Sequence, residues 1–404
     1  MSNDESRAAA YALAVLTFIN LFNYLDRWIL PAVLESIRRD LHFNDTQLGA
    51  LGTGFVVVYM LTSPIFGTLG DRKRRPPLIA LGVAIWSVAT SLAGFARGYI
   101  SLFTARSAIG IGEAAYGTIA PALLADHFPI EKRGRVYAIF FAAIPIGSAA
   151  GYVAGGLLDQ RFGWRHAFWF AGAPGLLLAL LVLAVREVPR GQHDEHLAAR
   201  DDRAASVVYR DLFRNRQYFL SCLGYAAWTF AIGGLGVWTP AFLERARGLS
   251  RAEATVTFGA IALFTGTIGT FGGGWIADAL LNRTKQAYLW VCGVSMILAA
   301  PIAFVAFTNA SKPVYLTAIV LAEVLVFAAS GPVNSAIVNA VAPSERASAV
   351  ALSIFIIHLL GDVPSPTLIG ILSDRTSLAT AFLIVPVAIL ISGLIWSYAA
   401  TRRI

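Results

Sequence analysis

The sequence is poor in charge and lacks the patterns that mark nucleotide- or metal-dependent enzymes. Only 14% of its 404 residues are charged and 57% are hydrophobic, whereas soluble domains average about 25% charged residues. The two cysteines, Cys222 and Cys292, lie inside apolar stretches, so no disulfide framework is indicated. No G-x-x-x-x-G-K-[ST] phosphate loop, H-E-x-x-H motif or Cys/His cluster occurs. We therefore expect no cofactor, no bound metal and no enzymatic activity.

What the chain has instead is a series of long apolar stretches. Each is about 20 residues long, the length that crosses roughly 30 Å of hydrocarbon as a helix. Backbone groups in lipid must bond one another, so these stretches must be helical, and the alternating segments of a membrane β-barrel do not appear. The expected transmembrane helices are 11–34, 47–69, 77–96, 100–124, 135–158, 166–186, 216–243, 254–277, 286–308, 314–340, 348–372 and 378–400. The sequence thus predicts an all-α membrane protein whose surroundings are the lipid bilayer.

The basic residues indicate topology rather than a nucleic-acid partner. The net charge is +8, but the basic side chains lie in short loops between the apolar stretches. With the N-terminus inside, inner segments hold 20 Lys and Arg residues and outer segments hold 10. Because positive loops stay in the cytoplasm, we expect both termini there, in the cell membrane or an inner membrane.

Short motifs recur in the two parts of the chain, which indicates a duplication. The repeats, at offsets of 207 or 214 residues, are Gly67–Asp71 with Gly274–Asp278, Pro129–Glu131 with Pro343–Glu345, and Ala167–Phe168 with Ala381–Phe382. We expect two six-helix halves, 1–186 and 216–404, joined by a polar cytoplasmic linker, 187–215. Parallel six-helix repeats are a transporter architecture with the substrate site at the repeat interface, and we expect the chain to act as a monomer.

Several strings resemble a known family. GTLGDRKRR, at 67–75, is similar to the signature loop of the major facilitator superfamily, and RSAIGIG, at 106–112, resembles that superfamily's fourth-helix motif. PIGSAAGYVAGG, at 145–156, resembles its fifth-helix motif without the usual Gly-Pro pair. Within the superfamily, NYLDR (23–27), the stretch 110–128 and the stretch 143–156 resemble the Spinster family of lipid transporters. The superfamily resemblance spans the chain and implies the major facilitator fold. The Spinster resemblance is strong over about residues 20–160 and weak in the second half, and it implies a substrate of the sphingolipid or lysophospholipid class.

Four charged residues of the first half lie at membrane depth, where each charge costs roughly 2.5–3.5 kcal/mol. Arg106 and Glu113, seven residues apart, share one face of the fourth helix. Asp26 and Arg27 lie on the first helix, and the resemblance implies that both helices line the central cavity. We predict a proton switch in which Arg106 moves between Asp26 and Glu113. The alternative is a static ion network, and with either, Arg27 or Arg106 could bind an anionic headgroup.

The loop after the second helix predicts a latch on the cytoplasmic side. A carboxylate such as Asp71 can pair with the positive N-terminus of a neighbouring helix, and Ser344, Glu345 and Arg346 open the eleventh helix. The alternative is that these charges only set topology. The residues of the predicted latch are Gly67, Asp71, Arg72, Arg75, Glu345 and Arg346.

The second half offers fewer charged residues. Glu323 lies within the tenth helix, and His358 with Asp362 forms an i, i+4 pair in the eleventh. Pro364 and Pro366 follow this pair and should break or bend the helix. We predict that Glu323, His358 and Asp362 line a cavity, the alternative being hydrogen-bonded packing.

These features predict a secondary active transporter that works by alternating access, coupled to protons, with an amphipathic lipid-like substrate. An exporter of drugs or small organic ions, or a uniporter without ion coupling, is the alternative within the same class. A channel or receptor is the alternative from another class, and the internal repeat, the predicted latch and the polar positions at membrane depth argue against it.

Overall fold

The computed structural model describes residues 3–192, 205–342 and 345–401, and these residues form helices and no strand. Twelve of the helices are long and apolar enough to cross a membrane, which confirms the predicted number of spans. Those before the linker are α1 (Asn3–Leu41), α2 (Asp45–Arg72), α3 (Arg75–Ala93), α4 (Tyr99–His127), α5 (Ile130–Phe162) and α6 (Trp164–Leu183). Four of these helices extend past both ends of the expected spans because polar residues continue them beyond the apolar stretch, whereas α3 and α6 end three residues before the expected ends.

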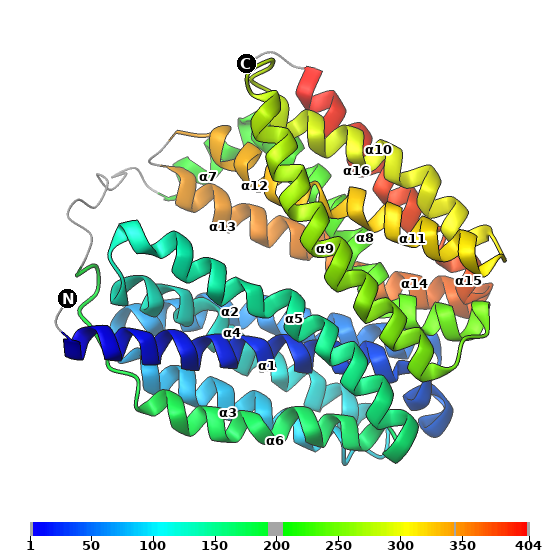
Figure 1. Cartoon of the computed structure of the whole chain (residues 1–404), viewed down its shortest axis with the longest axis horizontal. Coiled ribbons are helices and arrows are strands. Elements are labelled where there is room, and N and C mark those ends of the chain that lie inside the picture. The colour runs from blue at the N-terminus through cyan, green and yellow to red at the C-terminus, as the bar shows by residue number, and fades with distance from the viewer. Residues whose placement is uncertain (1–2, 193–204, 343–344, 402–404) are drawn as a thin grey trace. The chain divides into compact units, whose positions relative to one another are not determined.

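The helices of the second half (Figure 1) form six further spans, and three of these, Lys312–Asn339, Ser348–Arg375 and Leu378–Thr401, consist of more than one helical element. Its elements are α7 (Ala205–Arg214), α8 (Arg216–Arg247), α9 (Arg251–Leu280), α10 (Ala287–Thr308), α11 (Lys312–Phe327), α12 (Ser330–Asn339), α13 (Arg346–Ile357), the π-helix η2 (His358–Asp362), α14 (Pro364–Arg375), α15 (Leu378–Ala381) and α16 (Ile384–Thr401). The chain thus has the twelve-helix architecture of two six-helix halves.

Local sequence explains where several helices begin and end. Asn44 Oδ1 accepts a hydrogen bond from the Gln47 backbone N–H at 2.8 Å, and Gln47 Oε1 accepts one from the Asn44 N–H at 3.1 Å. This reciprocal capping box starts α2. α8 ends at Gly248, whose φ of 68° is left-handed and suits a residue without Cβ.

The chain divides into two compact units. One comprises Met1–Leu197 with Ser250–Gly259, and the other comprises Ala198–Leu249 with Ala260–Ile404. The main neighbours in the first unit are α1 with α5, α2 with α4, α3 with α4, and α3 with α6. In the second unit they are α10 with α16, α8 with α16, and α10 with α11.

Small residues on α4 allow two helices to approach it closely. A Cβ added at Gly110 would lie 2.6 Å from the Phe55 carbonyl oxygen of α2, and one at Gly112 would lie 2.6 Å from the Trp86 nitrogen of α3. Side chains larger than hydrogen at these positions would push α2 and α3 away. α4 therefore holds its neighbours close at the depth of Arg106 and Glu113.

The second half departs from the expected spans in the linker and in the tenth span, and agrees with the expectation in the eleventh. The predicted linker contains α7, which buries Val208 and Leu212, four residues apart. The expected span 314–340 is divided between Phe327 and Ser330, because Pro332 has no N–H for the Ala328 carbonyl and its ring clashes there. As expected, the helix before Pro364 is interrupted, by a π turn in which the Val363 N–H donates to the His358 carbonyl at 3.1 Å.

Candidate functional site

The first unit brings four charged side chains from α1 and α4 together. Asp26 is fully buried, Arg106 is 2% exposed and Glu113 is 1% exposed, whereas the Arg27 side chain is 25% exposed. Asp26 interacts electrostatically with Arg106, Glu113 and Arg27. Burying one unpaired charge is costly. Two carboxyls grouped with two guanidinium groups offset this cost and can therefore remain inside the bundle.

Glu113 takes its ion-pair partner from α1 rather than from its own helix. The Arg27 Nη2 atom lies 2.5 Å from Glu113 Oε2, and Arg27 Nε lies 3.2 Å from the same oxygen. The other carboxylate oxygen, Glu113 Oε1, is buried and has no hydrogen-bond partner among the residues that the structure describes. The predicted switch pairs Glu113 with Arg106, whereas in the structure Arg27 carries this salt bridge, as a member of the ion network that was the alternative.

Asp26 and Arg106 lie close in the same cluster without a direct hydrogen bond. Asp26 Oδ2 accepts a hydrogen bond from the Thr90 hydroxyl of α3, while Asp26 Oδ1 has no hydrogen-bond partner in the described part of the chain. The Nε and Nη1 atoms of Arg106 are likewise buried without a hydrogen-bond partner. Unsatisfied buried donors and acceptors cost about 1–3 kcal/mol each, more when charged. Arg106 therefore has two buried donor atoms that can still form hydrogen bonds.

Aromatic rings surround the guanidinium groups. The Cζ atom of Arg27 lies 4.9 Å from the ring centroid of Tyr24, 5.1 Å from that of Phe55 and 5.5 Å from that of Tyr59. The Phe55 ring is also 5.5 Å from the Cζ atom of Arg106. Cation–π contacts of this kind stabilise a cation by about 0.5–2 kcal/mol each, so both arginines stay charged without two full salt bridges.

A small cavity opens beside the Arg27–Glu113 pair. Its volume is about 100 Å³, and its lining combines Arg27 and Glu113 with the side chains of Asn20, Asn23 and Tyr24 and with aromatic residues of α2, α4 and α5. Since a water molecule occupies about 30 Å³ of liquid, this space holds a few waters or a small polar group. In this structure the space is too small for a whole lipid molecule.

Three contributors to the cluster had no sequence signal. Thr90, Phe55 and Tyr59 lie on α2 and α3, which the sequence treats as ordinary apolar spans. A threonine or an aromatic residue in such a span is common and carries no periodicity of its own. Their roles depend on α2 and α3 packing on α4, which a reading of one helix at a time does not reveal.

The residues of the predicted latch lie in two different settings. Asp71 and Arg72 are exposed at the end of α2, and the space around Gly67 is open. Glu345 precedes α13 and Arg346 begins it, whereas Ser344 lies outside the described residues. Arg75 differs from the other latch residues, because it is 3% exposed and bonded within the first unit.

Arg75 joins three segments at one end of the first unit. Its Nη1 atom lies 2.5 Å from Asp126 Oδ2 of α4, its Nε atom 2.7 Å from Glu187 Oε1, and its Nη2 atom donates to the Val188 carbonyl at 2.8 Å. Glu187 Oε2 also accepts from the Arg75 backbone N–H at 2.7 Å. The last arginine of the signature loop therefore ties the start of the linker to α3 and α4.

The polar residues of the second unit are placed separately from one another. Thr265 Oγ1 of α9 lies 2.9 Å from Glu323 Oε2, and Glu323 is 3% exposed. His358 Nδ1 lies 2.9 Å from Asp362 Oδ1 within η2, and both side chains are about one-fifth exposed.

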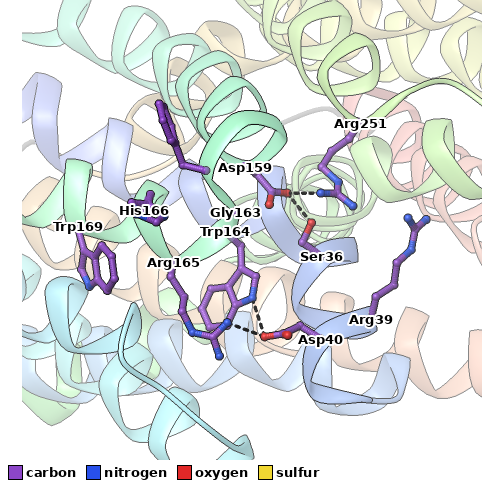
Figure 2. A pocket seen from close by; sticks show the side chains of 11 residues that line it. Ser36, Arg39, Asp40, Asp159, Gly163, Trp164, Arg165, His166, Trp169 and Arg251 are labelled. Atoms are coloured by element: carbon purple, nitrogen blue, oxygen red, sulfur yellow. Dashed lines mark hydrogen bonds and ion pairs between the residues drawn. The ribbon is translucent and has the colours of Figure 1, made fainter.

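A larger cavity, of about 470 Å³, lies at the C-terminal end of α1 in the first unit (Figure 2). Figure 2 shows that Arg165, Asp40, Asp159 and Arg251 of this cavity are already bonded: Arg165 lies 2.6 Å from Asp40, and Asp159 accepts from Ser36 at 2.5 Å and pairs with Arg251 at 3.2 Å. Volume alone favours this space as the functional site. Each cavity has buried polar atoms without a hydrogen-bond partner among the described residues, Glu113 Oε1 and Asn23 Nδ2 in the smaller one and Trp169 Nε1 in the larger one. The smaller cavity is the better candidate because its unsatisfied atoms include a buried carboxyl oxygen, which a proton or a ligand can bind.

Comparisons with known proteins agree in both sequence and fold. The sequence model of the protein family described as the Major Facilitator Superfamily matches residues 16–363 of this chain. Protein spinster homolog 3 of Danio rerio is 36% identical over 390 residues, which cover 92% of this chain and 78% of that protein. Protein spinster homolog 1 of Homo sapiens is 36% identical over 387 residues, covering 91% of this chain and 73% of that protein. These alignments extend over both halves.

Solved structures show the same architecture at lower sequence identity. A bacterial homologue of the human lysosomal transporter Spinster, crystallised in an inward-facing and unoccupied conformation, has a TM-score of 0.89 at 24% identity and covers 99% of this chain, with 98% of that chain covered. A D-xylose–proton symporter has a TM-score of 0.73 at 14% identity, with 96% of each chain covered.

Proposed function

Because this chain belongs to the Spinster family of the major facilitator superfamily, we propose that it is a proton-coupled transporter of an amphipathic lipid-like substrate. Membership makes the chain a multi-pass integral membrane protein and a secondary transporter rather than an enzyme. Beyond family membership, we propose that the substrate belongs to the sphingolipid or lysophospholipid class and that the coupling ion is the proton.

The observation that carries the proposal is the Asp26, Arg27, Arg106 and Glu113 cluster beside the small cavity. With both carboxyls ionised, two negative charges balance two positive ones. A proton on Glu113 removes the charge that Arg27 binds at 2.5 Å, and leaves that guanidinium with donors for an anionic headgroup. Proton binding and headgroup binding then favour the same state of the first half.

Arg106 supplies the second part of the proposed switch. Its Nε and Nη1 atoms lack hydrogen-bond partners, and so do Asp26 Oδ1 and Glu113 Oε1. Small movements of α1 against α4 would let Arg106 bind one carboxylate and release the other. The protonation state of the two carboxyls would then select which pairing is stable, which links protons to conformation.

The cavity argues for a substrate with a small polar end and an apolar remainder. About 100 Å³ beside Arg27 suits a headgroup, and the aromatic lining provides apolar surface at its mouth. An exporter of cationic drugs is a poorer fit, since Arg27 and Arg106 would repel a cation unless both carboxylates stayed ionised and unpaired. A uniporter would use the same cavity without the proton.

We propose in addition that both termini are cytoplasmic, that residues 1–186 and 216–404 act as the two moving halves of a monomer, and that Asp71 and Arg72 with Glu345 and Arg346 close the cytoplasmic side. The excess of basic residues in the predicted inner loops supports the orientation. The exposure of Asp71 and Arg72, which have room to bind another segment, supports the latch.

Binding measurements on the purified protein test the function. Lysophospholipids, sphingoid phosphates and cationic drugs would be titrated into the protein at about pH 8 and about pH 5. These two values lie above and below the usual pKa of histidine and span the range in which a perturbed carboxyl can titrate. We expect the anionic lipids to bind, and to bind more tightly at the lower pH, with Glu113→Gln removing the pH dependence. Tight binding of cationic drugs alone would contradict the substrate class.

A further inference from the structure

Glu323 is a buried carboxyl that the cluster in the first half does not use. It lies near the middle of the span Lys312–Asn339, on α11, and is 3% exposed. A Cβ added at Gly269 of α9 would lie 2.5 Å from the Val324 carbonyl oxygen and 2.7 Å from the Phe327 Cβ. α9 therefore packs directly on the backbone of α11 beside Glu323, which keeps the carboxyl away from solvent.

No cation compensates Glu323 among the residues that the structure describes. Within the described residues, the Thr265 hydroxyl is the hydrogen-bond partner of its carboxyl and no ion pair involves it. Lys312 lies eleven residues earlier on the same helix, about 16 Å away at 1.5 Å per residue. α10 contains no charged residue, and the charges of α8 and α9 lie near the ends of those helices.

The titratable side chains that face α11 from its neighbours are occupied elsewhere. Cys292 of α10 lies 3.6 Å from the Ala329 carbonyl oxygen, and the Arg247 guanidinium of α8 lies 5.2 Å from the ring of Tyr315. Tyr225 of α8 packs on Trp228, whose indole N–H donates to the Val326 carbonyl. A negative charge on Glu323 would therefore stand alone in a low-dielectric setting, where it is strongly disfavoured.

The hydroxyl of Thr265 distinguishes the two forms of Glu323. Its Oγ1 atom lies 2.8 Å from the Ile261 carbonyl oxygen and 2.9 Å from Glu323 Oε2. A hydroxyl has one proton, and a carbonyl oxygen can only accept. If Glu323 is ionised, the hydroxyl must choose between two acceptors. If Glu323 is neutral, its O–H donates to Thr265 Oγ1, the hydroxyl donates to Ile261, and both contacts become hydrogen bonds.

We infer that Glu323 is a proton-binding site of the second half, protonated while α9 packs on α11 and exchanging its proton when that contact opens to water. The bound proton follows from the surroundings of the carboxyl alone. Only its exchange during transport rests on the proposed proton coupling, so the two parts can be tested separately.

Infrared difference spectroscopy of the full-length protein in lipid detects the proton directly. The unmodified protein at neutral pH should show the carbonyl stretch of a neutral carboxylic acid, and Glu323→Gln should lose that band. Thr265→Val should move the band upward in frequency, because the acid O–H loses its acceptor. Thr267→Val is the matched control, since Thr267 Oγ1 bonds only the Leu263 carbonyl and is exposed. An unchanged spectrum in Glu323→Gln would overturn the inference.

A pH series of the same spectra tests exchange. We expect the Glu323 band to disappear reversibly on raising the pH, and to do so at lower pH when substrate turnover is allowed. A band that persists at every pH and under turnover would make Glu323 a fixed polar group and overturn its role in exchange. If the band behaves as expected while no proton accompanies transport, the proposed function fails and the bound proton stands.

Discussion

Glu113 and Glu323 are two buried glutamates, 210 residues apart in a chain whose repeats recur at offsets of 207 and 214, and the protein stabilises them in opposite ways. Glu113 pairs with Arg27 at 2.5 Å and lies beside Arg106 and Asp26. Glu323 has a threonine hydroxyl at 2.9 Å and no cation paired with it among the described residues. The first half thus pairs its buried carboxyl with a cation, whereas the second half gives its buried carboxyl only a neutral hydroxyl, which favours the neutral form.

This difference gives the halves unequal tasks. A paired carboxylate can release or gain a cation when it is protonated, so the first half can change its internal pairing. An unpaired carboxyl can only gain or lose its proton, and losing it requires water. The first half is therefore the place where a proton can alter substrate contacts, whereas the second half can at most store a proton.

Breaking the salt bridge of the first half should give the largest effect. Arg27→Ala leaves Glu113 buried without its partner, and removing one member of a buried pair costs about 3–5 kcal/mol. We expect a clear loss of thermal stability and no measurable transport. Thermal stability is measured from unfolding in detergent, monitored by tryptophan fluorescence, and transport is measured as uptake into proteoliposomes.

The double variant Arg27→Leu with Glu113→Leu is the control for this result. Removing both charges abolishes the desolvation cost of each, so stability should return to within about 1 kcal/mol of the unmodified protein while transport stays absent. A double variant as unstable as Arg27→Ala would mean that packing, and not the unpaired charge, explains the loss.

Removing Arg106 should abolish transport at a smaller cost in stability. Arg106 has no salt bridge to lose in this structure, and its Nε and Nη1 atoms are unsatisfied. We expect Arg106→Ala to fold and insert, and to lose at least about tenfold in transport rate, equivalent to about 1.4 kcal/mol. Arg106→Lys keeps the charge without the planar fork, so it should retain only part of the activity. Normal transport by Arg106→Ala would contradict both the switch and a headgroup role for this residue.

Replacing each glutamate by glutamine compares the two halves directly. Glu113→Gln removes the charge that holds Arg27 and should destabilise the protein by about 1–3 kcal/mol. Glu323→Gln mimics a carboxyl that is already neutral and should change stability by less than about 0.5 kcal/mol. Paired thermal melts of the two variants test this, and equal losses would remove the distinction between the halves.

Sequence alone located the charged residues but not all of their partners. Twelve spans and the charges of Asp26, Arg106 and Glu113 are local signals, because apolar length and a charge at membrane depth are visible in one helix. Partners from distant segments carry no such signal. Arg75 was grouped with the predicted latch, yet it binds Glu187, 112 residues away in the predicted linker, and Thr90 reaches Asp26 only because α3 packs on α4.

The smallest effect is expected at the predicted latch. Asp71 is exposed, and exposed ion pairs contribute about 0.2–1 kcal/mol, so Asp71→Asn should change a two-state population at most about fivefold. Substrate affinity should stay nearly unchanged, while spin labels at the ends of α2 and α13 should show more of the longer distances. An identical distance distribution would leave Asp71 as a topology signal. Lys73→Gln, in the same loop, is the matched control.

Proton movement during lipid transport tests the central claim most directly. Purified protein would be reconstituted in liposomes that contain a pH-sensitive dye, and a lysophospholipid would be added without any imposed proton gradient. The account predicts a change of internal pH that accompanies uptake, disappears with Asp26→Asn or Glu113→Gln, and persists when the membrane potential is clamped. Lipid uptake of normal rate with no change of internal pH would contradict proton coupling and identify a uniporter.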